Sequence, residues 1–158
     1  MILYRVSNHA DLTGKGGELA DGKWHTRQLG RRIVYLSDHP ALCLLEILVH
    51  ISERDWLPDW YQLLSVDVPE HLIERLEPEA LSEGWQNDLT ITQQIGNSWL
   101  GSERSGLLVP SGIVPVSMNC IINPLAPGIK ALDVQVVGRF SFDKRLKRVQ
   151  SDDVQRVQ

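Results

Sequence analysis

The feature that most constrains the fold is the segment ALCLLEILVHI, residues 41–51. Nine of these 11 residues are apolar, and they lie on all sides of a helical wheel, which is typical of a buried helix. Ser37 and Asp38 precede it as candidate N-caps, and Pro40 suits the first turn. We therefore predict a largely buried helix over residues 40–53.

Glu46 and His50 are the exceptions in this apolar segment, and they lie one helical turn apart on the same face. A carboxylate in the middle of a buried helix costs free energy unless it is paired with another group or used in chemistry. Glu46 is therefore either a structural ion-pair partner, with Arg5 or Lys23 as candidates, or a functional residue.

Short strands are predicted around this helix, at residues 2–7, 32–36, 63–68, 106–109, 112–116, 119–124 and 132–137. A second helix is expected at 92–100, with a short helix and a turn at 70–77 and 78–84. Frequent proline and glycine indicate curved sheet pieces. The predicted fold class is α+β: compact mixed sheets of short curved strands around a central buried helix.

Length and composition fit one globular domain with a real core, since the chain has 158 residues, 42% hydrophobic and 23% charged. No run of 18 apolar residues and no signal-peptide pattern is visible, so we expect a cytoplasmic protein without membrane contact. Cys43 and Cys120 both lie in apolar runs, which predicts two buried, reduced thiols.

Charge is distributed unevenly along the chain, whose net charge is −4. Residues 139–158 hold six basic and three acidic groups, whereas residues 1–138 hold ten basic and 17 acidic ones. An acidic body argues against direct nucleic-acid binding. We expect a domain over residues 1–142 and a charged C-terminal tail over 143–158, which is either solvated or in contact with an acidic partner.

Familiar catalytic templates do not fit. The segment TGKGG, residues 13–17, lacks the spacing of a phosphate-binding P-loop, and no GxGxxG follows a strand. The five histidines show no metal-ligand spacing, so no metal site is expected. The sequence also lacks the GxSxG elbow of serine hydrolases.

What remains is a set of polar residues within apolar strands and the apolar helix: Arg5, Tyr35, Glu46, Ser111 and Asn123. Structural explanations exist for the individual residues. Arg5 would form a strand-end ion pair, and Tyr35 would be a core residue whose hydroxyl reaches water. Ser111 and Asn123 would cap turns beside prolines. The alternative is that these residues form one active site.

Several segments resemble a known family when taken together. They are GKWHT at 22–26, RIVYLS at 32–37, PALCLLEILVH at 40–50, VPSGIVP at 109–115 and NCIINP at 119–124. In this order and at these separations they resemble the RES domain, whose name refers to characteristic Arg, Glu and Ser residues. The resemblance covers roughly residues 2–140.

The resemblance implies a toxin of a bacterial toxin–antitoxin pair, with a fold similar to ADP-ribosyltransferases. Such toxins consume NAD+ as a substrate and retain no cofactor. Some cleave the nicotinamide–ribose bond by hydrolysis or phosphorolysis, and some transfer ADP-ribose to a protein. The implied partner is an Xre-type DNA-binding antitoxin that covers the active site. A catalytically degenerate NAD-binding module is a further alternative.

Position by position, the resemblance implies Glu46, Tyr35 and Ser111 as catalytic residues. Glu46 would stabilise the cationic sugar in the transition state, Tyr35 would stack on nicotinamide, and Ser111 would orient either Glu46 or a ribose hydroxyl. The implied NAD-binding residues are Arg5, Lys23, Tyr35, Arg32 and Asn123.

Two positions depart from the family pattern. Lys23 stands where an arginine is usual, which keeps the charge but loses the bidentate fork, so Arg27, Arg31 or Arg32 are candidate substitutes. Ala126 stands where many members carry a histidine.

Two surface features have open interpretations. The glycine-rich loop at 14–22 is a candidate to close over the dinucleotide. The group Trp56, Leu57 and Trp60 either forms a contact patch, which leaves room for a homodimer within a larger complex, or covers the helix end.

Overall fold

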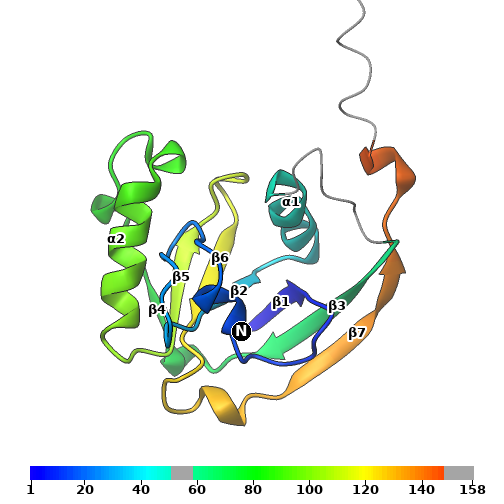
Figure 1. Cartoon of the computed structure of the whole chain (residues 1–158), viewed down its shortest axis with the longest axis horizontal. Helices are drawn as coiled ribbons and strands as arrows, with labels where there is room; N and C mark the ends of the chain where they lie inside the picture. Colours follow the sequence, from blue (N-terminus) through cyan, green and yellow to red (C-terminus); the bar gives the residue numbers. More distant parts are fainter. Residues whose placement is uncertain (51–58, 148–158) are drawn as a thin grey trace, which may run out of the picture.

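The computed structural model describes residues 1–50 and 59–147 and shows one seven-stranded sheet with two α-helices (Figure 1). The strand order is β4-β5-β6-β2-β1-β3-β7. The paired strands run antiparallel, apart from the parallel pair β4–β5. The strands are β1 (Ile2–Val6), β2 (Val34–Ser37), β3 (Trp60–Asp67), β4 (Ile73–Arg75), β5 (Gly106–Pro110), β6 (Met118–Ile122) and β7 (Val134–Ser141). The helices are α1 (Pro40–His50) and α2 (Leu89–Leu100).

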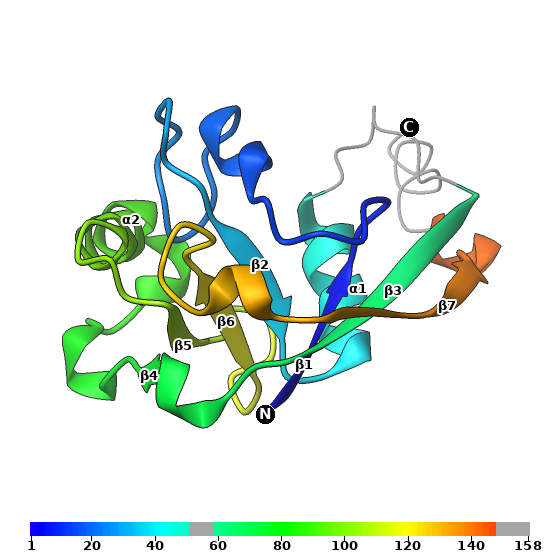
Figure 2. The ribbon, with the colours of Figure 1, turned by 90° about the horizontal axis from the view of Figure 1, so that it is seen from below.

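The sheet is strongly twisted: in Figure 1, β5 and β6 run steeply while β3 and β7 cross the view diagonally. A register shift between Leu63 and Leu64 adds to the twist where β3 pairs with β7. Figure 2 shows the same sheet from below, with α2 beside the β4–β6 half and α1 beside β1 and β2. The predicted α+β class with short curved strands is confirmed.

Alternation along the central strands divides the core into two clusters. On β5, Leu107 and Val109 face a cluster that contains three tryptophans, while Leu108 faces the other cluster. The helix α2 packs closely beside the tryptophan cluster: a Cβ at Gly96 would lie 1.8 Å from the Trp24 carbonyl oxygen. No side chain larger than hydrogen fits at Gly96 without movement of the backbone.

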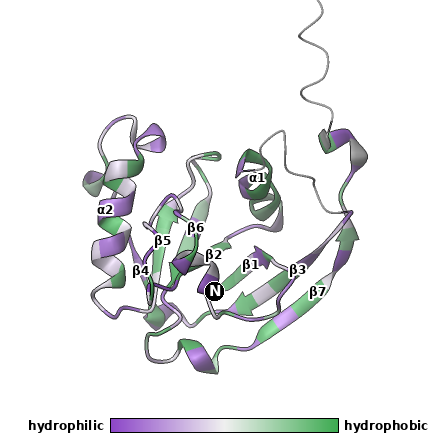
Figure 3. Ribbon diagram, viewed as in Figure 1, coloured by the Kyte–Doolittle hydropathy of each residue, from purple (hydrophilic) through white to green (hydrophobic). Residues whose placement is uncertain are grey.

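The helix α1 is less buried than its composition predicts. It contacts β1 and β2, and only Leu42 and Cys43 are fully buried, whereas Leu45 is 39% and Val49 58% exposed. Figure 3 shows α1 as hydrophobic over most of its length, so its outward face is apolar as well. The prediction of a largely buried helix was wrong, because the sheet covers only one side of α1 and leaves the other side exposed.

Two predicted elements differ in the structure. Residues 112–116 were expected to form a strand but form turns, because the Ser111 side chain bonds the backbone there and Pro110 and Pro115 interrupt a ladder. The short helix expected at 70–77 is one 3-10 turn followed by β4, which pairs with β5.

Other expectations fall on the described residues only in part. Trp56 and Leu57 lie outside the described residues, and Trp60 at the start of β3 is 42% exposed. Cys43 and Cys120 are buried free thiols, as predicted. No helix within residues 1–50 and 59–147 is long and apolar enough to cross a membrane.

Candidate active site

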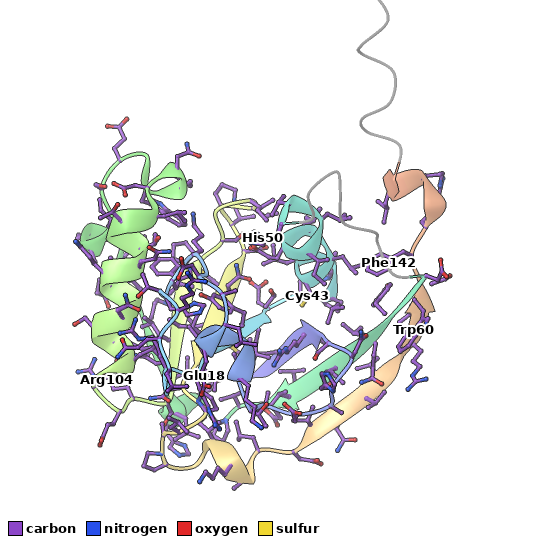
Figure 4. All side chains as sticks on the ribbon, in the orientation of Figure 1. Glu18, Cys43, His50, Trp60, Arg104 and Phe142 are labelled. Carbon is purple, nitrogen blue, oxygen red and sulfur yellow. The ribbon has the colours of Figure 1, made fainter. Side chains whose placement is uncertain are left out.

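A cavity of about 1040 Å³ is lined by residues of β1, β2, β6 and α1 and by the long segment between β1 and β2. Four of the seven predicted site residues line it, namely Arg5, Lys23, Tyr35 and Glu46. Two further lining residues on α1, Cys43 and His50, are labelled in Figure 4. The volume is typical of a site for a small organic ligand.

Glu46 is held through one of its two carboxylate oxygens. The Asn119 amide nitrogen donates to Oε1 at 2.6 Å, and the Ser111 hydroxyl donates to the same oxygen at 3.2 Å. Within the described part of the chain, Oε2 receives no hydrogen bond and Glu46 forms no salt bridge. The structural ion pair considered from the sequence is therefore absent among these residues, and one oxygen remains for a ligand.

The sheet register explains why Asn119 reaches Glu46. Asn119 on β6 lies directly opposite Ser37 on β2, so the two side chains share one face of the sheet. The Ser37 hydroxyl donates to the Asn119 side-chain oxygen at 2.7 Å, which leaves the amide nitrogen for Glu46. Asn119 was not predicted as a site residue, although a polar residue at the start of the apolar run NCII was a local signal.

Ser111 is oriented by the turn that follows β5. Its hydroxyl oxygen accepts the backbone N–H groups of Ile113 and Val114, each at 3.1 Å, which directs its own proton to Glu46. Ser111 is fully buried and does not line the cavity. Two roles were predicted for Ser111, to orient Glu46 or to orient a ribose hydroxyl, and this geometry supports the first.

Three cations line the cavity, namely Arg5, Lys15 and Lys23, and two of them, Arg5 and Lys23, are predicted site residues. Arg5 makes one long hydrogen bond, at 3.5 Å to the Asp11 carbonyl, and burial lowers the pKa of its guanidinium while Asp11 opposes that shift. The Lys23 ammonium donates to the Gln86 carbonyl at 2.6 Å and lies 5.2 Å from the centre of the Trp85 ring. Burial lowers the pKa of Lys23, and the nearby Glu46 carboxylate raises it.

Tyr35 is held by its hydroxyl group. The Trp24 backbone N–H donates to the phenol oxygen at 3.1 Å, and Nδ1 of His25 lies 2.9 Å from the same oxygen. Burial raises the pKa of Tyr35 far above its ordinary value, so the phenol stays protonated. Tyr35 therefore presents a neutral aromatic ring at the cavity wall.

Arg32 and Asn123 lie elsewhere. Both line a second cavity of about 550 Å³, and neither lines the first. Arg32 donates to Glu18 at 2.8 Å, and the Asn123 side chain accepts the Leu125 N–H at 3.1 Å as a turn cap. The structure therefore does not bring them together with Glu46. Ala126, at the position where the resemblance predicts a histidine, is buried beside that second cavity.

Among the described residues, no three His, Cys, Asp or Glu side chains converge to form a cluster of metal ligands. The groups that line the first cavity include a half-anchored carboxylate, three cations and an aromatic ring. This combination suits an anionic ligand that also carries a group able to become positively charged.

Known proteins of similar sequence match most of the length of this chain. The toxin Res of Photorhabdus laumondii is 37% identical over 92% of this chain and 97% of its own. The toxin Res of Pseudomonas putida is also 37% identical, over 92% of this chain and 99% of its own. The Prs ADP-ribosylating toxin of a Sphingobium species is 33% identical over 87% of this chain and 88% of its own.

A solved structure has the same fold. A chain of the M. tuberculosis MbcT–MbcA toxin–antitoxin complex superposes with a TM-score of 0.67 at 20% identity, covering 92% of this chain and 86% of that one. The family model of the RES domain matches residues 2–144. The chain therefore belongs to the RES domain family.

Proposed function

We propose that this protein is the toxin of a bacterial toxin–antitoxin pair and that it cleaves NAD+ at the bond between nicotinamide and ribose. The observation that carries the proposal is the Glu46 carboxylate, held at Oε1 by Asn119 and Ser111 in a cavity of about 1040 Å³ that also contains Arg5 and Lys23. Relatives 37% identical over 92% of this chain are named toxin Res, which supports the biological role.

Cleavage of the nicotinamide–ribose bond needs negative charge more than acid catalysis. Nicotinamide leaves as a neutral group, and the sugar carbon passes through an oxocarbenium-like state, as in other glycoside cleavage. A fixed carboxylate beside that carbon stabilises the developing cation and does not have to reorganise during the reaction. Glu46 has this character, because two donors fix its position and one oxygen is left for the sugar.

The other residues suit the remainder of the substrate. The diphosphate of NAD+ is anionic, and Arg5 and Lys23 are cations in the same cavity. Lys23 already bonds the Gln86 carbonyl, so we assign the larger share of diphosphate binding to Arg5. The ring of Tyr35 is an aromatic partner for the cationic nicotinamide.

The proposed reaction consumes water and releases nicotinamide, ADP-ribose and a proton. Nicotinamide release by the purified full chain, followed by chromatography, tests it. We expect the Glu46→Gln variant to lose at least about a hundredfold in rate, as when an electrostatic contact to a transition state is removed. Glu79→Gln, at an exposed position in a 3-10 turn, is the matched control and keeps wild-type turnover. Equal rates in wild type and Glu46→Gln would contradict the proposal.

Transfer of ADP-ribose to a protein is the second candidate, because a relative 33% identical to this chain is named Prs ADP-ribosylating toxin. The cavity and the role of Glu46 would be the same, and the acceptor would be a protein side chain in place of water. Mass spectrometry of cell proteins after expression separates the two reactions, since a dominant modified protein supports transfer. Formation of phosphorylated ADP-ribose in phosphate buffer would instead identify phosphorolysis.

A degenerate module that binds NAD+ without cleaving it is the non-enzymatic alternative. Calorimetry that finds NAD+ binding without nicotinamide release would favour it. The proposal also includes an antitoxin partner, for which the fold shared with a chain of a toxin–antitoxin complex is the support. We retain the Xre-type DNA-binding protein as the expected partner, and co-purification of the two proteins after expression in the same cells tests it.

A further inference from the structure

The hydrogen bonds at the Tyr35 hydroxyl determine which protons are present there. Its oxygen accepts the Trp24 backbone N–H at 3.1 Å and lies 2.9 Å from Nδ1 of His25. If Nδ1 carried a proton, two donors would point at one oxygen and the phenol proton would have no partner in this pair. If Nδ1 is unprotonated, the phenol donates to it and all three groups are satisfied.

The surroundings of His25 favour the same neutral state. His25 is only 3% exposed, so a charged imidazolium there would lose most of its hydration. Burial lowers the pKa of His25, and the charge of Arg31 adds to that effect. The Asp21 carboxylate and backbone groups of Gly17 and Ala20 act in the opposite direction but more weakly than burial. The imidazole is therefore neutral, with its proton on Nε2.

The backbone at Gly22 packs tightly against both side chains of the pair. A Cβ at Gly22 would lie 2.6 Å from the Tyr35 hydroxyl oxygen and 2.6 Å from Cε1 of His25. The Gly22 N–H donates to the His25 carbonyl at 2.9 Å, and Gln93 on α2 donates to the Gly22 carbonyl at 2.9 Å. The turn from Gly22 to His25 is thus fixed to α2 and pressed against the phenol.

We infer that His25 is a positioning residue for Tyr35: Nδ1 of its neutral imidazole accepts a hydrogen bond from the phenol and fixes the aromatic ring in the cavity wall. The inference rests on the proposed function, in which the Tyr35 ring contacts the substrate. It adds that the hydroxyl of Tyr35 is engaged by the protein, so the ring and not the hydroxyl serves the nicotinamide.

Substitutions at position 25 test the inference through nicotinamide release from NAD+. His25→Leu keeps side-chain volume but removes the acceptor and leaves a buried hydroxyl without its partner. A cost of that kind corresponds to roughly a tenfold loss of kcat/KM. His25→Asn places an amide oxygen near the position of Nδ1, and we expect it to restore kcat/KM to within about threefold of wild type. His71→Gln, at an exposed position, is the control for loss of a histidine.

A double-mutant cycle separates positioning from a general structural role. In the Tyr35→Phe background there is no phenol to hold, so His25→Leu should cost less than about twofold. An equal loss in both backgrounds, or failure of a folded His25→Asn variant to recover, would overturn the inference.

Nitrogen NMR of the histidine side chains gives a readout that does not depend on turnover. At pH 7.5 we expect the His25 resonances, assigned by their absence in His25→Asn, to show the neutral form protonated at Nε2. An imidazolium or an Nδ1-protonated ring would overturn the inference. A wild-type protein without NAD+ cleavage would refute the proposed function, and the NMR result would still decide the state of His25.

Discussion

The variant Asn119→Ala tests whether the position of Glu46, and not only its presence, determines the rate of nicotinamide release. In Asn119→Ala the carboxylate stays in the cavity but loses the shorter of its two hydrogen bonds, at 2.6 Å, and keeps the one from Ser111 at 3.2 Å. Hydrogen bonds to charged groups contribute about 1.5–3 kcal/mol, which corresponds to roughly 10- to 150-fold in rate. We expect a loss at the lower end of this range, because Ser111 still holds the same oxygen.

The loss should appear mainly in kcat for nicotinamide release, because the orientation of Glu46 matters most in the transition state. Asn123→Ala is the matched control. Asn123 follows the same strand and is as buried as Asn119, with 6% and 8% exposed, but it caps a turn outside the cavity. Both variants should lose thermal stability, and only Asn119→Ala should lose kcat. Equal kinetic losses in the two variants, or none in Asn119→Ala, would refute the reasoning.

Three further predictions concern stability and reactivity. Gly96→Ala should lower the melting temperature by several degrees, because its Cβ would lie 1.8 Å from the Trp24 carbonyl oxygen; an unchanged melting curve would contradict this packing. Burial lowers the pKa of His25 in the folded protein, so the unfolded chain binds more protons than the folded one as pH falls below about 6.5. The stability of the wild type should therefore decline with acid more steeply than that of His25→Asn, and denaturant titrations at pH 7.5 and 5.5 measure the difference. Burial raises the thiol pKa of Cys43 to about 11 and that of Cys120 to about 12, so both thiols should react slowly with a disulfide reagent at pH 7.5 and rapidly in denaturant; fast reaction of the native protein would contradict their burial.

The features predictable from the sequence were those encoded locally. Glu46 stands out because one carboxylate interrupts a continuous apolar helix, and the structure places it at the cavity. The β1, β2 and β6 strands were predicted within about two residues of their bounds, since each is a short apolar run beside turn residues. The burial of both cysteines followed from the same local pattern.

The features that sequence reasoning missed depend on register and tertiary contacts. Asn119 reaches Glu46 because it pairs with Ser37 across two strands, and no local pattern specifies that pairing. His25 meets Tyr35, ten residues further along the chain, through a turn closed by Gly22, and no local pattern specifies that contact.

Errors arose where a local pattern had two outcomes. Apolar residues at 112–116 look like a strand, but the Ser111 hydroxyl binds two backbone N–H groups and forms a turn. Asn123 lies two residues beyond Ile121 and would share its face of the sheet if β6 continued. The strand ends at Ile122, however, and the Asn123 side chain caps a turn. The exposed face of α1 shows that an apolar helix need not be covered on all sides by its own chain.

The central claim is that the free oxygen of Glu46 faces the sugar carbon that loses nicotinamide. A crystal structure of the Glu46→Gln variant soaked with NAD+ tests it most directly, because the substitution slows cleavage and preserves the shape of the side chain. We predict an intact dinucleotide in the first cavity, with its nicotinamide ribose against residue 46 and its diphosphate near Arg5. A dinucleotide bound elsewhere, or a ribose remote from residue 46, would contradict the account.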